Sequence, residues 1–365
     1  MLLSSLRAKF RKFDFLLFGS VVLLVVIGLT AIYSVSLSSE NPDFTNFKKQ
    51  LVYFGLGLIF ILILSAINFS AFRLYSRYVY LGSIILLILV LFFGSTVRGT
   101  TGWFNFIGLR FQPVEIAKIG LLLFLARFFA NRFHQFNQAK HIVVSLVGTM
   151  ILVFLVLLQP DVGSASVLFG IWVLLMIISG VRLRYVATML VSLALIVLLL
   201  WTFAFADYQK NRVLTFLNPE LDPLGSGYNV TQAIIAVGSG NLMGRGLGFG
   251  SQSQLKFIPE SQTDFVFAVV AEELGLLGVS LMLALWVLIF YRLIQSAKKA
   301  RDDFGMYLLL GIACLFFIHL LVNVGMNMGL LPVTGISLPF TSYGGSFMIA
   351  CFILIGFAES VIVSE

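Results

Sequence analysis

Long apolar runs recur along the whole chain and are separated by short polar stretches. An apolar run of about 18 or more residues is long enough to cross the hydrocarbon core of a bilayer as a helix. The pattern therefore predicts an all-α, polytopic membrane protein with about ten transmembrane helices. The expected spans are 14–36, 50–68, 79–95, 113–130, 142–158, 164–180, 186–205, 264–291, 305–327 and 347–363.

The composition agrees with this reading. Hydrophobic residues make up 59% of the 365, charged residues only 11%, and the mean hydropathy is +1.02. A soluble domain carries about 25% charged residues, so most of this chain must face lipid or other apolar helices. We expect one integral membrane domain over residues 1–365. Cys314, Cys351 and His319 lie within predicted spans, where packing thiols and a packing or hydrogen-bonding histidine are expected.

The distribution of positive charge predicts the orientation. An even number of crossings places both termini on one side, and short cytoplasmic loops carry an excess of Lys and Arg. The N-terminal "RAKFRKF" and the predicted loops on its side hold most of the 24 Lys and Arg residues. Both termini are therefore expected in the cytoplasm. The net charge of +8 follows from this topology and from anionic lipid, so it predicts no nucleic-acid partner.

Polar segments collect on the opposite, extracytoplasmic side. They are residues 95–113, 159–164, 330–347 and the long connection 206–263 between the seventh and eighth spans. Loops longer than about 15 residues are usually functional or disordered. We expect 206–263 to be an ordered loop that covers an outward-facing cavity, with a short helix around "VTQAIIAVGSG". The functional site is therefore expected towards the outer leaflet.

Several ionisable residues fall inside or at the ends of the predicted spans. Glu115 and Lys118 are three residues apart and so share a helix face. Asp161 lies between two spans, Asp264 opens the eighth, and Glu272 lies deeper in it. A charge at such depth costs about 2.5–3.5 kcal/mol unless it is paired or hydrated. This cost favours a functional site that uses these groups.

Each group also has a structural alternative. Glu115 and Lys118 form a self-neutralising pair in the simplest interpretation of their burial. Glu272 and its neighbour Glu273 suit structural carboxyl groups or protonated hydrogen-bond donors, because burial raises carboxyl pKa values. Asp264 in "SQTDF" suits a helix N-cap, where an acid complements the helix dipole. The residues by themselves leave these alternatives open.

The glycine-rich "GSGNLMGRGLGFGS" (238–251) resembles a phosphate loop only superficially. No strand is predicted before it, and it falls on the side where nucleotides are scarce. Tight turns and close backbone approach explain its glycines better. Its backbone amides and Arg245 would still suit an anionic lipid headgroup.

Five segments together resemble one known family. They are "RFQPVEIAK" (110–118), "QPDVGSA" (159–165), "NPELDPLGSGYNVTQAIIAVGSG" (218–240), "PESQTDFVFAVVAEELGLLG" (259–278) and "NVGMNMGLLPVTGISLPFTSYGGS" (323–346). In this order they resemble the SEDS family (shape, elongation, division, sporulation) of bacterial cell-wall polymerases. "RFQP" and "NVGMNMGLLPVTGISLP" look more like the elongation branch, RodA, than the division branch, FtsW.

The resemblance implies peptidoglycan glycosyltransfer at the outer face of the bacterial cytoplasmic membrane. The substrate would be lipid II, and the 4-hydroxyl of an acceptor sugar would attack the anomeric carbon of the donor MurNAc with inversion. Undecaprenyl pyrophosphate would leave. The implied protein partner is a class B penicillin-binding protein, a transpeptidase. No cofactor is assigned with certainty, and a divalent cation, Mg²⁺ or Mn²⁺, is a candidate requirement.

The resemblance also implies roles for individual residues. Asp264 matches the catalytic aspartate of the "TD" motif and is expected to act as general base. Arg110, Lys118 and Arg212 match basic positions that suit the pyrophosphate, with Glu115 orienting Lys118. The implied substrate-binding set is Trp103, Arg110, Gln112, Glu115, Lys118, Asp161, Arg212, Ser342 and Tyr343. For Asp161, the acid of "QPD", the resemblance implies either that it positions substrate or that it supports the fold.

The chain departs from the family pattern at three positions. Gly102 precedes Trp103 where many relatives have Arg, which argues against a cationic role beside that tryptophan. Gln262 stands where His is frequent and cannot shuttle a proton at neutral pH. Asn241 replaces a glycine in the "GSGN" turn. None of these changes removes the expected base.

Two other function classes fit parts of the pattern. A lipid-precursor flippase or transporter would share the polytopic topology and the buried acids, with Glu272 as a proton relay. Alternating access, however, predicts comparable polar segments on both faces, whereas here they gather on one. A non-catalytic scaffold for a division or elongation partner would tolerate substitution of the external acids. The FtsW-like division polymerase is the alternative within the family.

Overall fold

The computed structural model describes residues 12–37, 42–97, 99–106, 109–132, 139–182, 184–185, 187–188, 191, 214–216 and 226–364. Its principal helices are α2 (Phe15–Ser36), α3 (Thr45–Ala66), α4 (Phe69–Phe93), α5 (Pro113–Ala130), α6 (Ala139–Leu157), α7 (Val162–Ile178), α10 (Ser226–Ser239), α11 (Ser251–Gln254), α12 (Val266–Lys299), α13 (Asp303–Asn327) and α14 (Gly345–Ser364). Within the described part of the chain, helices overlap nine of the ten expected spans. The remaining span, 186–205, lies outside the described residues apart from 187–188 and 191.

Seven helices among the described residues are long and apolar enough to cross a membrane: α2, α3, α4, residues 140–157 of α6, α12, α13 and α14. Helix α7 is apolar but shorter, with 17 residues. Helix α5 has 18 residues and carries three charged ones, Glu115, Lys118 and Arg127. The chain is thus a multi-pass membrane protein, and the total of ten crossings stays a prediction.

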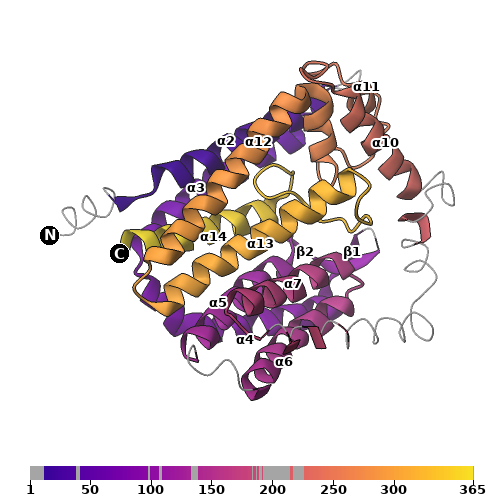
Figure 1. Ribbon diagram of the computed structural model, residues 1–365. Helices are drawn as coiled ribbons and strands as arrows, with labels where there is room; N and C mark the ends of the chain where they lie inside the picture. The colour runs from indigo at the N-terminus through magenta and orange to yellow at the C-terminus, as the bar shows by residue number, and fades with distance from the viewer. Residues whose placement is uncertain are drawn as a thin grey trace.

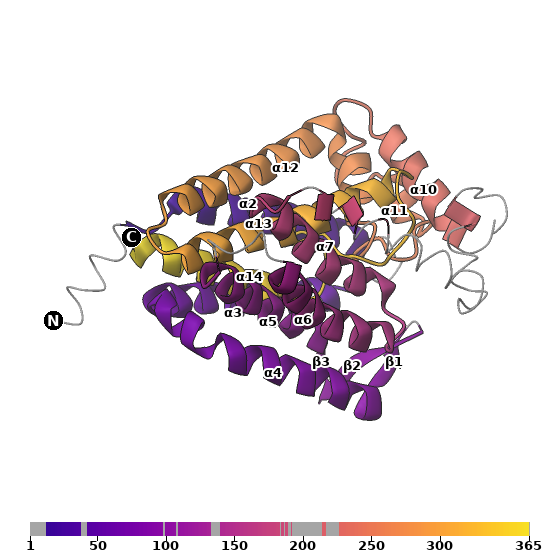
Figure 2. The ribbon, with the colours of Figure 1, turned by 60° about the horizontal axis from the view of Figure 1, so that its bottom comes forward.

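The helices form a bundle in which α13 is central, packed against α5, α7 and α12 (Figure 1). Helix α14 packs along α3, and α2 along α12. At one end the start of α2 meets α14 and α12: Asp14 N donates to Glu359 Oε2 at 3.1 Å, and Arg292 Nε donates to Asp14 Oδ2 at 2.7 Å. Helices α10 and α11 lie at the opposite end, which we call the polar end (Figure 2).

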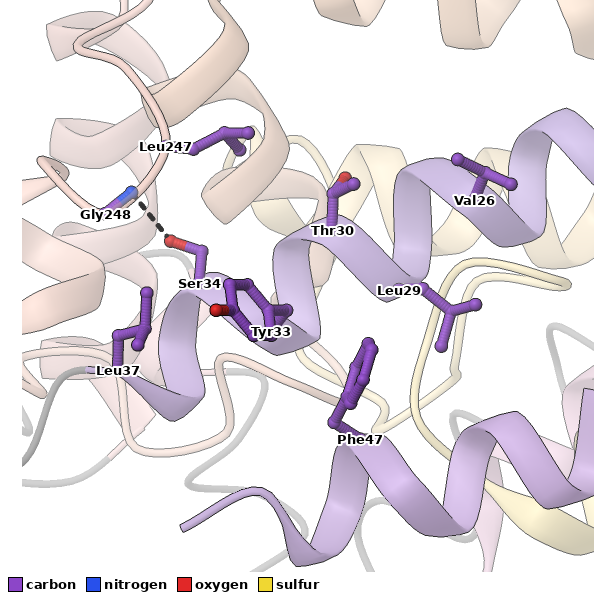
Figure 3. A pocket seen from close by; sticks show the side chains of 9 residues that line it. All are labelled: Val26, Leu29, Thr30, Tyr33, Ser34, Leu37, Phe47, Leu247 and Gly248. Carbon is purple, nitrogen blue, oxygen red and sulfur yellow. Dashed lines mark hydrogen bonds between the residues drawn. The ribbon is translucent and has the colours of Figure 1, made fainter. Parts of the chain in front are cut away.

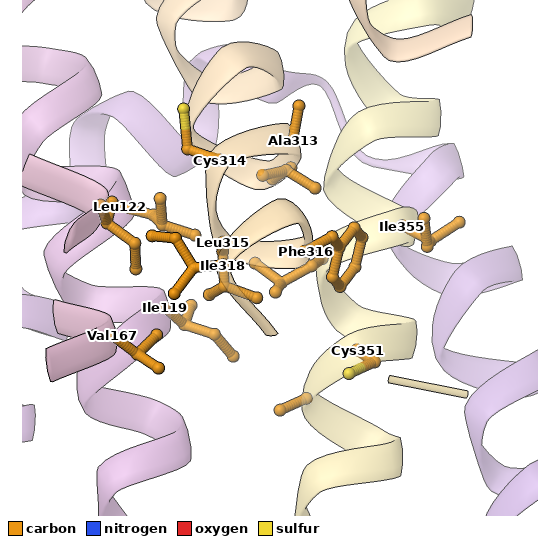
Figure 4. Close-up of a cluster of buried hydrophobic side chains, with 14 of the residues drawn as sticks. Ile119, Leu122, Val167, Ala313, Cys314, Leu315, Phe316, Ile318, Cys351 and Ile355 are labelled. Carbon is orange, nitrogen blue, oxygen red and sulfur yellow. The ribbon is translucent and has the colours of Figure 1, made fainter. Parts of the chain in front are cut away.

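The interior of the bundle is filled by apolar side chains. In one region Leu122 of α5, Val167 of α7 and Leu315 of α13 lie close together and are buried (Figure 4). Both cysteines of the chain, Cys314 and Cys351, are free and buried in this cluster. The prediction of packing thiols is confirmed. Because lipid is as apolar as these residues, close packing rather than burial from water holds the helices together.

A small antiparallel sheet lies between α4 and α5 and was not predicted. Its strands are β1 (Ser95–Val97), β2 (Thr100–Phe106) and β3 (Leu109–Phe111), in the order β1-β2-β3. Gly99 takes a positive φ of +80° in the turn that brings Val97 opposite Thr100. A run rich in Thr, Val and aromatic residues around Gly is a hairpin signal. The mainly helical fold is confirmed, and the hairpin adds to it.

Helix α12 is broken at Gly275, which has φ 65° and ψ −164°. Its 34 residues would extend about 51 Å, more than the roughly 30 Å of a hydrocarbon core. The break frees backbone groups, and the loop after α10 pairs with them: Leu276 N donates to Asn241 O at 2.9 Å and Arg245 N to Glu272 O at 2.9 Å. The glycine-rich loop is therefore a backbone partner of α12, as its close-approach interpretation predicted.

We expect Gly275→Ala to destabilise the protein by about 1–3 kcal/mol, because only glycine readily adopts this backbone conformation. An added β-carbon would also collide with the backbone of Gly244. The measurement is the unfolding temperature of the purified protein. Gly82→Ala in α4 is the matched control, since a β-carbon there meets nothing within 4 Å. Equal unfolding temperatures for the two variants would contradict this account of the break.

Candidate functional site

Asp264 lies at the polar end, just before α12, and is partly exposed. The helix begins at Val266, and its N-cap is Phe265, which offers no side-chain cap. The structure therefore gives the N-cap position to Phe265, and the N-cap interpretation of Asp264 is not supported. A β-carbon placed on Gly335 would lie 3.7 Å from Asp264 Oδ2, so the carboxylate faces this exposed glycine.

The backbone next to Asp264 is held by the segment 328–344, which connects α13 and α14 and which we call the α13–α14 segment. The Ser342 hydroxyl donates to Thr263 O at 2.6 Å, and Tyr343 N donates to Gln262 O at 2.8 Å. Ser342 Oγ in turn accepts from Leu338 N at 2.8 Å. Ser342 and Tyr343, both predicted site residues, are therefore adjacent to the "TD" motif.

A buried ion pair lies deeper in the bundle. Lys118 Nζ is 2.8 Å from Glu115 Oε1 and 3.3 Å from His319 Nε2, and the exposed fractions of the three residues are 3%, 6% and 2%. His319 Nδ1 lies 3.0 Å from Ser337 O. Since a carbonyl only accepts, Nδ1 carries the proton and Nε2 accepts from the ammonium. The predicted Glu115–Lys118 pair is present, and His319 extends it to a buried cluster of three side chains.

Asp161 begins α7 as its N-cap. Its carboxylate accepts from Ser164 N at 2.9 Å and from the Ser164 hydroxyl at 2.7 Å. Gly163, in the first turn, packs against the α13–α14 segment: an added β-carbon would lie 2.5 Å from Thr334 O. Asp161 thus shapes the helix start that contacts the segment carrying Gly335. This contact supports the fold-supporting role among those implied for Asp161.

The end of β3 contacts the first turn of α14, just after the α13–α14 segment. The Ser346 hydroxyl donates to Arg110 O at 3.0 Å and accepts from Gln112 N at 3.2 Å. Burial raises the pKa of the Tyr343 hydroxyl, Tyr53 adds to the rise, and the Arg110 guanidinium opposes it. The exposed Arg110 therefore lies near Tyr343. Arg110 therefore lies near a residue whose backbone N donates to Gln262 O, two positions before Asp264.

Residues 14–365 match the family model FtsW/RodA/SpoVE, described as cell cycle proteins. The chain belongs to the FtsW/RodA/SpoVE family. The SEDS resemblance of its motifs is thereby confirmed.

Relatives in the FtsW/RodA/SpoVE family cover almost the whole chain. The peptidoglycan glycosyltransferase MrdB of Escherichia coli (strain K12) is 37% identical over 344 residues, 93% of this chain and 92% of the relative. Stage V sporulation protein E of Bacillus subtilis (strain 168) is 35% identical over 353 residues, 94% of this chain and 95% of the relative.

Solved structures show the same arrangement. A chain of a peptidoglycan synthase complex, studied for the coordination of polymerization and crosslinking, has a TM-score of 0.82 and 32% identity, covering 96% of this chain and 97% of that one. The rod shape determining protein RodA of Thermus thermophilus has a TM-score of 0.71 and 29% identity, covering 96% of both chains.

The remaining predicted site residues are placed differently. Trp103 lies on β2 opposite Ser95. The sheet packs against the "QPD" segment, because a β-carbon on Gly102 would lie 3.2 Å from Gln159 Oε1. Arg212 lies outside the described residues. The described substrate-binding candidates therefore surround the α13–α14 segment or the sheet beside it, and their contacts with substrate stay predictions.

Glu272 and Glu273 of α12 brace the polar end. Glu272 accepts from Gln252 N at 2.8 Å and from Ser253 N at 3.0 Å, so it caps the short helix α11. Glu273 Oε1 accepts from the Ser34 hydroxyl of α2 at 2.6 Å and from the Ser253 hydroxyl at 3.2 Å. Their adjacent positions in an apolar span are explained by these contacts, as the structural interpretation predicted.

An apolar pocket of about 330 Å³ lies between α2, α3 and the glycine-rich loop (Figure 3). The Ser34 hydroxyl lies at its edge and accepts from Gly248 N at 2.9 Å. The lining residues are Val26, Leu29, Thr30, Tyr33, Ser34, Leu37, Phe47, Leu247 and Gly248. None of them is a predicted site residue, and their aliphatic and aromatic side chains suit a hydrocarbon chain.

Sequence reasoning missed several buried amides around the site. Gln50 of α3 is 1% exposed; its Nε2 donates to Ser342 O at 3.0 Å and its Oε1 accepts from Gly344 N at 3.2 Å. Asn323 and Asn327 of α13 are fully buried against Asp264. Their isolated positions in apolar spans could have identified these amides from the sequence, since polar groups in such spans face the protein interior and mark functional regions.

Proposed function

We propose that the chain is a peptidoglycan glycosyltransferase that polymerises lipid II at the outer face of the bacterial cytoplasmic membrane, in cell elongation. The relative MrdB, 37% identical, is named a peptidoglycan glycosyltransferase. The observation that carries the proposal is the placement of Asp264: its carboxylate faces the exposed Gly335, and its neighbouring backbone is fixed by Ser342. A general base needs such a rigid, accessible position.

In the proposed reaction the acceptor 4-hydroxyl gives its proton to Asp264 as its oxygen attacks the anomeric carbon of the donor. The new glycosidic bond forms while the bond from that carbon to the pyrophosphate oxygen breaks, and the electron pair leaves with undecaprenyl pyrophosphate. The exposed guanidinium of Arg110 would stabilise the charge on the leaving group. Lys118, enclosed between Glu115 and His319, would add a fixed positive charge nearby.

The lipid part of the substrate needs an apolar path beside the site. We assign part of the polyprenyl chain to the pocket between α2 and α3, because its wall consists mainly of side chains such as Leu29, Phe47 and Leu247. The pocket borders the loop that Glu273 and Ser34 hold in place. Membrane lipid would occupy the same pocket in the absence of substrate.

We propose a class B penicillin-binding protein as partner, which would supply the transpeptidase. The similar chain of known structure belongs to a complex that couples polymerization with crosslinking. The polymerase described here would deliver strands, and the partner would crosslink them.

A divalent cation, Mg²⁺ or Mn²⁺, is proposed to act through the substrate. Among the described residues, no group of three or more His, Cys, Asp or Glu side chains is placed to hold a metal. Mg²⁺ commonly binds one or two carboxylates together with substrate phosphates. We expect chelation to slow polymerisation and added Mg²⁺ or Mn²⁺ to restore it; an unchanged rate in chelator would remove the cation from the mechanism.

The test of the proposed function is strand synthesis by the purified chain with its partner, whose transpeptidase serine is inactivated. Labelled lipid II is supplied, and the products are separated by length. Glycan strands are the expected result. Movement of lipid II across the bilayer without strands would favour the flippase, and neither strands nor movement would favour the scaffold.

A further inference from the structure

One face of α13 carries three polar residues in an otherwise apolar helix. His319, Asn323 and Asn327 follow one another at intervals of four residues and therefore share a face. Asn323 and Asn327 are fully buried, and His319 is 2% exposed. Buried amides are costly unless their hydrogen bonds are satisfied. Their hydrogen-bond partners therefore show which backbone groups this face of α13 fixes in place.

Asn323 uses both hydrogens of its amide. Its Nδ2 donates to Asp264 O at 2.9 Å and to Ile336 O at 2.7 Å. These two carbonyls belong to the two chain segments that face each other across the candidate site, one ending at Asp264 and one containing Gly335. Asn323 therefore fixes the separation between the "TD" motif and the α13–α14 segment.

Asn327 holds the same carbonyl from the next turn. Its Nδ2 donates to Asp264 O at 3.0 Å and to Asn323 O at 2.8 Å. Its Oδ1 accepts from Ala268 N, in the first turn of α12, at 3.2 Å. Ala268 N also donates to Phe265 O at 3.1 Å, so Asn327 adds a side-chain acceptor from a neighbouring helix to the first turn of α12. One side chain thus ties Asp264 to the helix that follows it.

Asp264 O is the shared acceptor of both asparagines. Two further contacts immobilise the preceding carbonyls, from Ser342 to Thr263 O and from Tyr343 N to Gln262 O. Three consecutive carbonyls are therefore held from α13 and from the α13–α14 segment. The backbone of residues 262–264 is therefore fixed on this side.

We propose that Asn323 and Asn327 are positioning residues that jointly set the carboxylate of Asp264 against Gly335 for proton transfer. The proposal rests on the proposed function of Asp264. Neither asparagine touches the reacting atoms; both act through the backbone of the base. Misplacement of a reacting group by about 1 Å costs on the order of 10²-fold in rate, so loss of this support lowers the rate of chemistry while substrate binding persists.

Ordinary helix packing is the alternative, since asparagines also join membrane helices by hydrogen bonds. Positioning and packing can be distinguished because both asparagines donate to the same acceptor, Asp264 O. When one asparagine is truncated, the other still donates to Asp264 O. In the double variant this carbonyl has lost both amide donors. Residues that act on one group are non-additive in their kinetic effects, whereas independent packing contacts add.

The experiment compares Asn323→Ala, Asn327→Ala and the double variant with wild type in the full-length protein with its partner. The quantities are kcat and KM for lipid II and the unfolding temperature. Asn68→Ala is the control, because Asn68 also accepts from an N–H in the first turn of a helix, that of Ser70 in α4. It lies where Ile67 contacts Ser360 near the C-terminal end of α14, away from the polar end. Asp264→Asn is measured in the same series.

We expect each single variant to lower kcat about 3- to 10-fold, and the double variant to lower it by more than the product of the two, about 10²-fold or beyond. KM should stay within about twofold of wild type. Effects on kcat that match Asn68→Ala, or a double effect equal to the product, overturn the proposal. If the double variant does not fold, the single variants decide, because a loss of kcat at unchanged KM and unfolding temperature is required of them.

Failure of this inference is distinguishable from failure of the proposed function. An inactive wild type would overturn the proposed function, and an active Asp264→Asn would overturn the assignment of the base. An inactive Asp264→Asn together with asparagine variants that behave like the control overturns only the positioning role.

Discussion

Asp264→Asn is expected to abolish glycan strand formation while the protein stays folded. Removal of a general base typically lowers a rate by about 10²- to 10⁴-fold. Asparagine has nearly the same shape as aspartate but cannot take the proton of the acceptor hydroxyl. The contacts from Asn323 and Asn327 go to the backbone carbonyl of residue 264, so the substitution leaves them in place. The measurement is the rate of lipid II consumption with the partner present.

Asp43→Asn is the matched control for this substitution. Asp43 is exposed and precedes α3, where its carboxylate accepts from Thr45 N at 2.9 Å. We expect its loss to leave the rate unchanged, because an exposed turn contact contributes little. If Asp264→Asn keeps a rate within about threefold of wild type, well short of the loss of a base, the base has to be sought elsewhere, first at Asp161 or Glu115.

Lys118→Met is expected to cost about 3–5 kcal/mol of stability, the usual penalty for breaking a buried ion pair from one side. Glu115 would be left buried without its cation, and His319 Nε2 would lose its donor. The unfolding temperature in detergent measures this loss. Methionine fills much of the volume of the lysine stem, so the effect reports the charge rather than a cavity.

The double variant Glu115→Gln/Lys118→Met separates the structural pair from a role in catalysis. Removal of both charges of a buried pair is often close to neutral for stability, so we expect the unfolding temperature to recover most of what Lys118→Met loses. Polymerisation should remain strongly impaired, because the positive charge near the pyrophosphate is gone. A double variant that is both stable and fully active would show that the pair serves the fold alone.

Local patterns predicted what depends on neighbouring residues. The apolar runs predicted α2, α5 and α13 closely, and the spacing of Glu115 and Lys118 predicted their ion pair. The apolar stretch in the long loop predicted a short helix, and α10 lies there. The depth of Glu272 and Glu273 predicted that both needed partners. Each of these features is determined within one element or by the cost of burial.

Features that depend on distant segments escaped prediction. "SQTDF" is typical of an N-cap, yet α12 begins at Val266, and Asn327, some sixty residues later, contacts its first turn. The α13–α14 segment holds the backbone beside Asp264 and contacts His319 and the start of α7, and no local pattern shows that convergence. The roles of Gln50 and Asn323 depend on the same tertiary contacts.

The most direct test of the central claim is strand synthesis by oriented protein in sealed vesicles, with lipid II supplied to one face at a time. The proposed mechanism predicts strands from wild type only when lipid II is on the face that bears α10 and α11, and none from Asp264→Asn on either face. Strands formed from the opposite face, or equal synthesis by Asp264→Asn, would contradict a glycosyltransferase site at the polar end with Asp264 as its base.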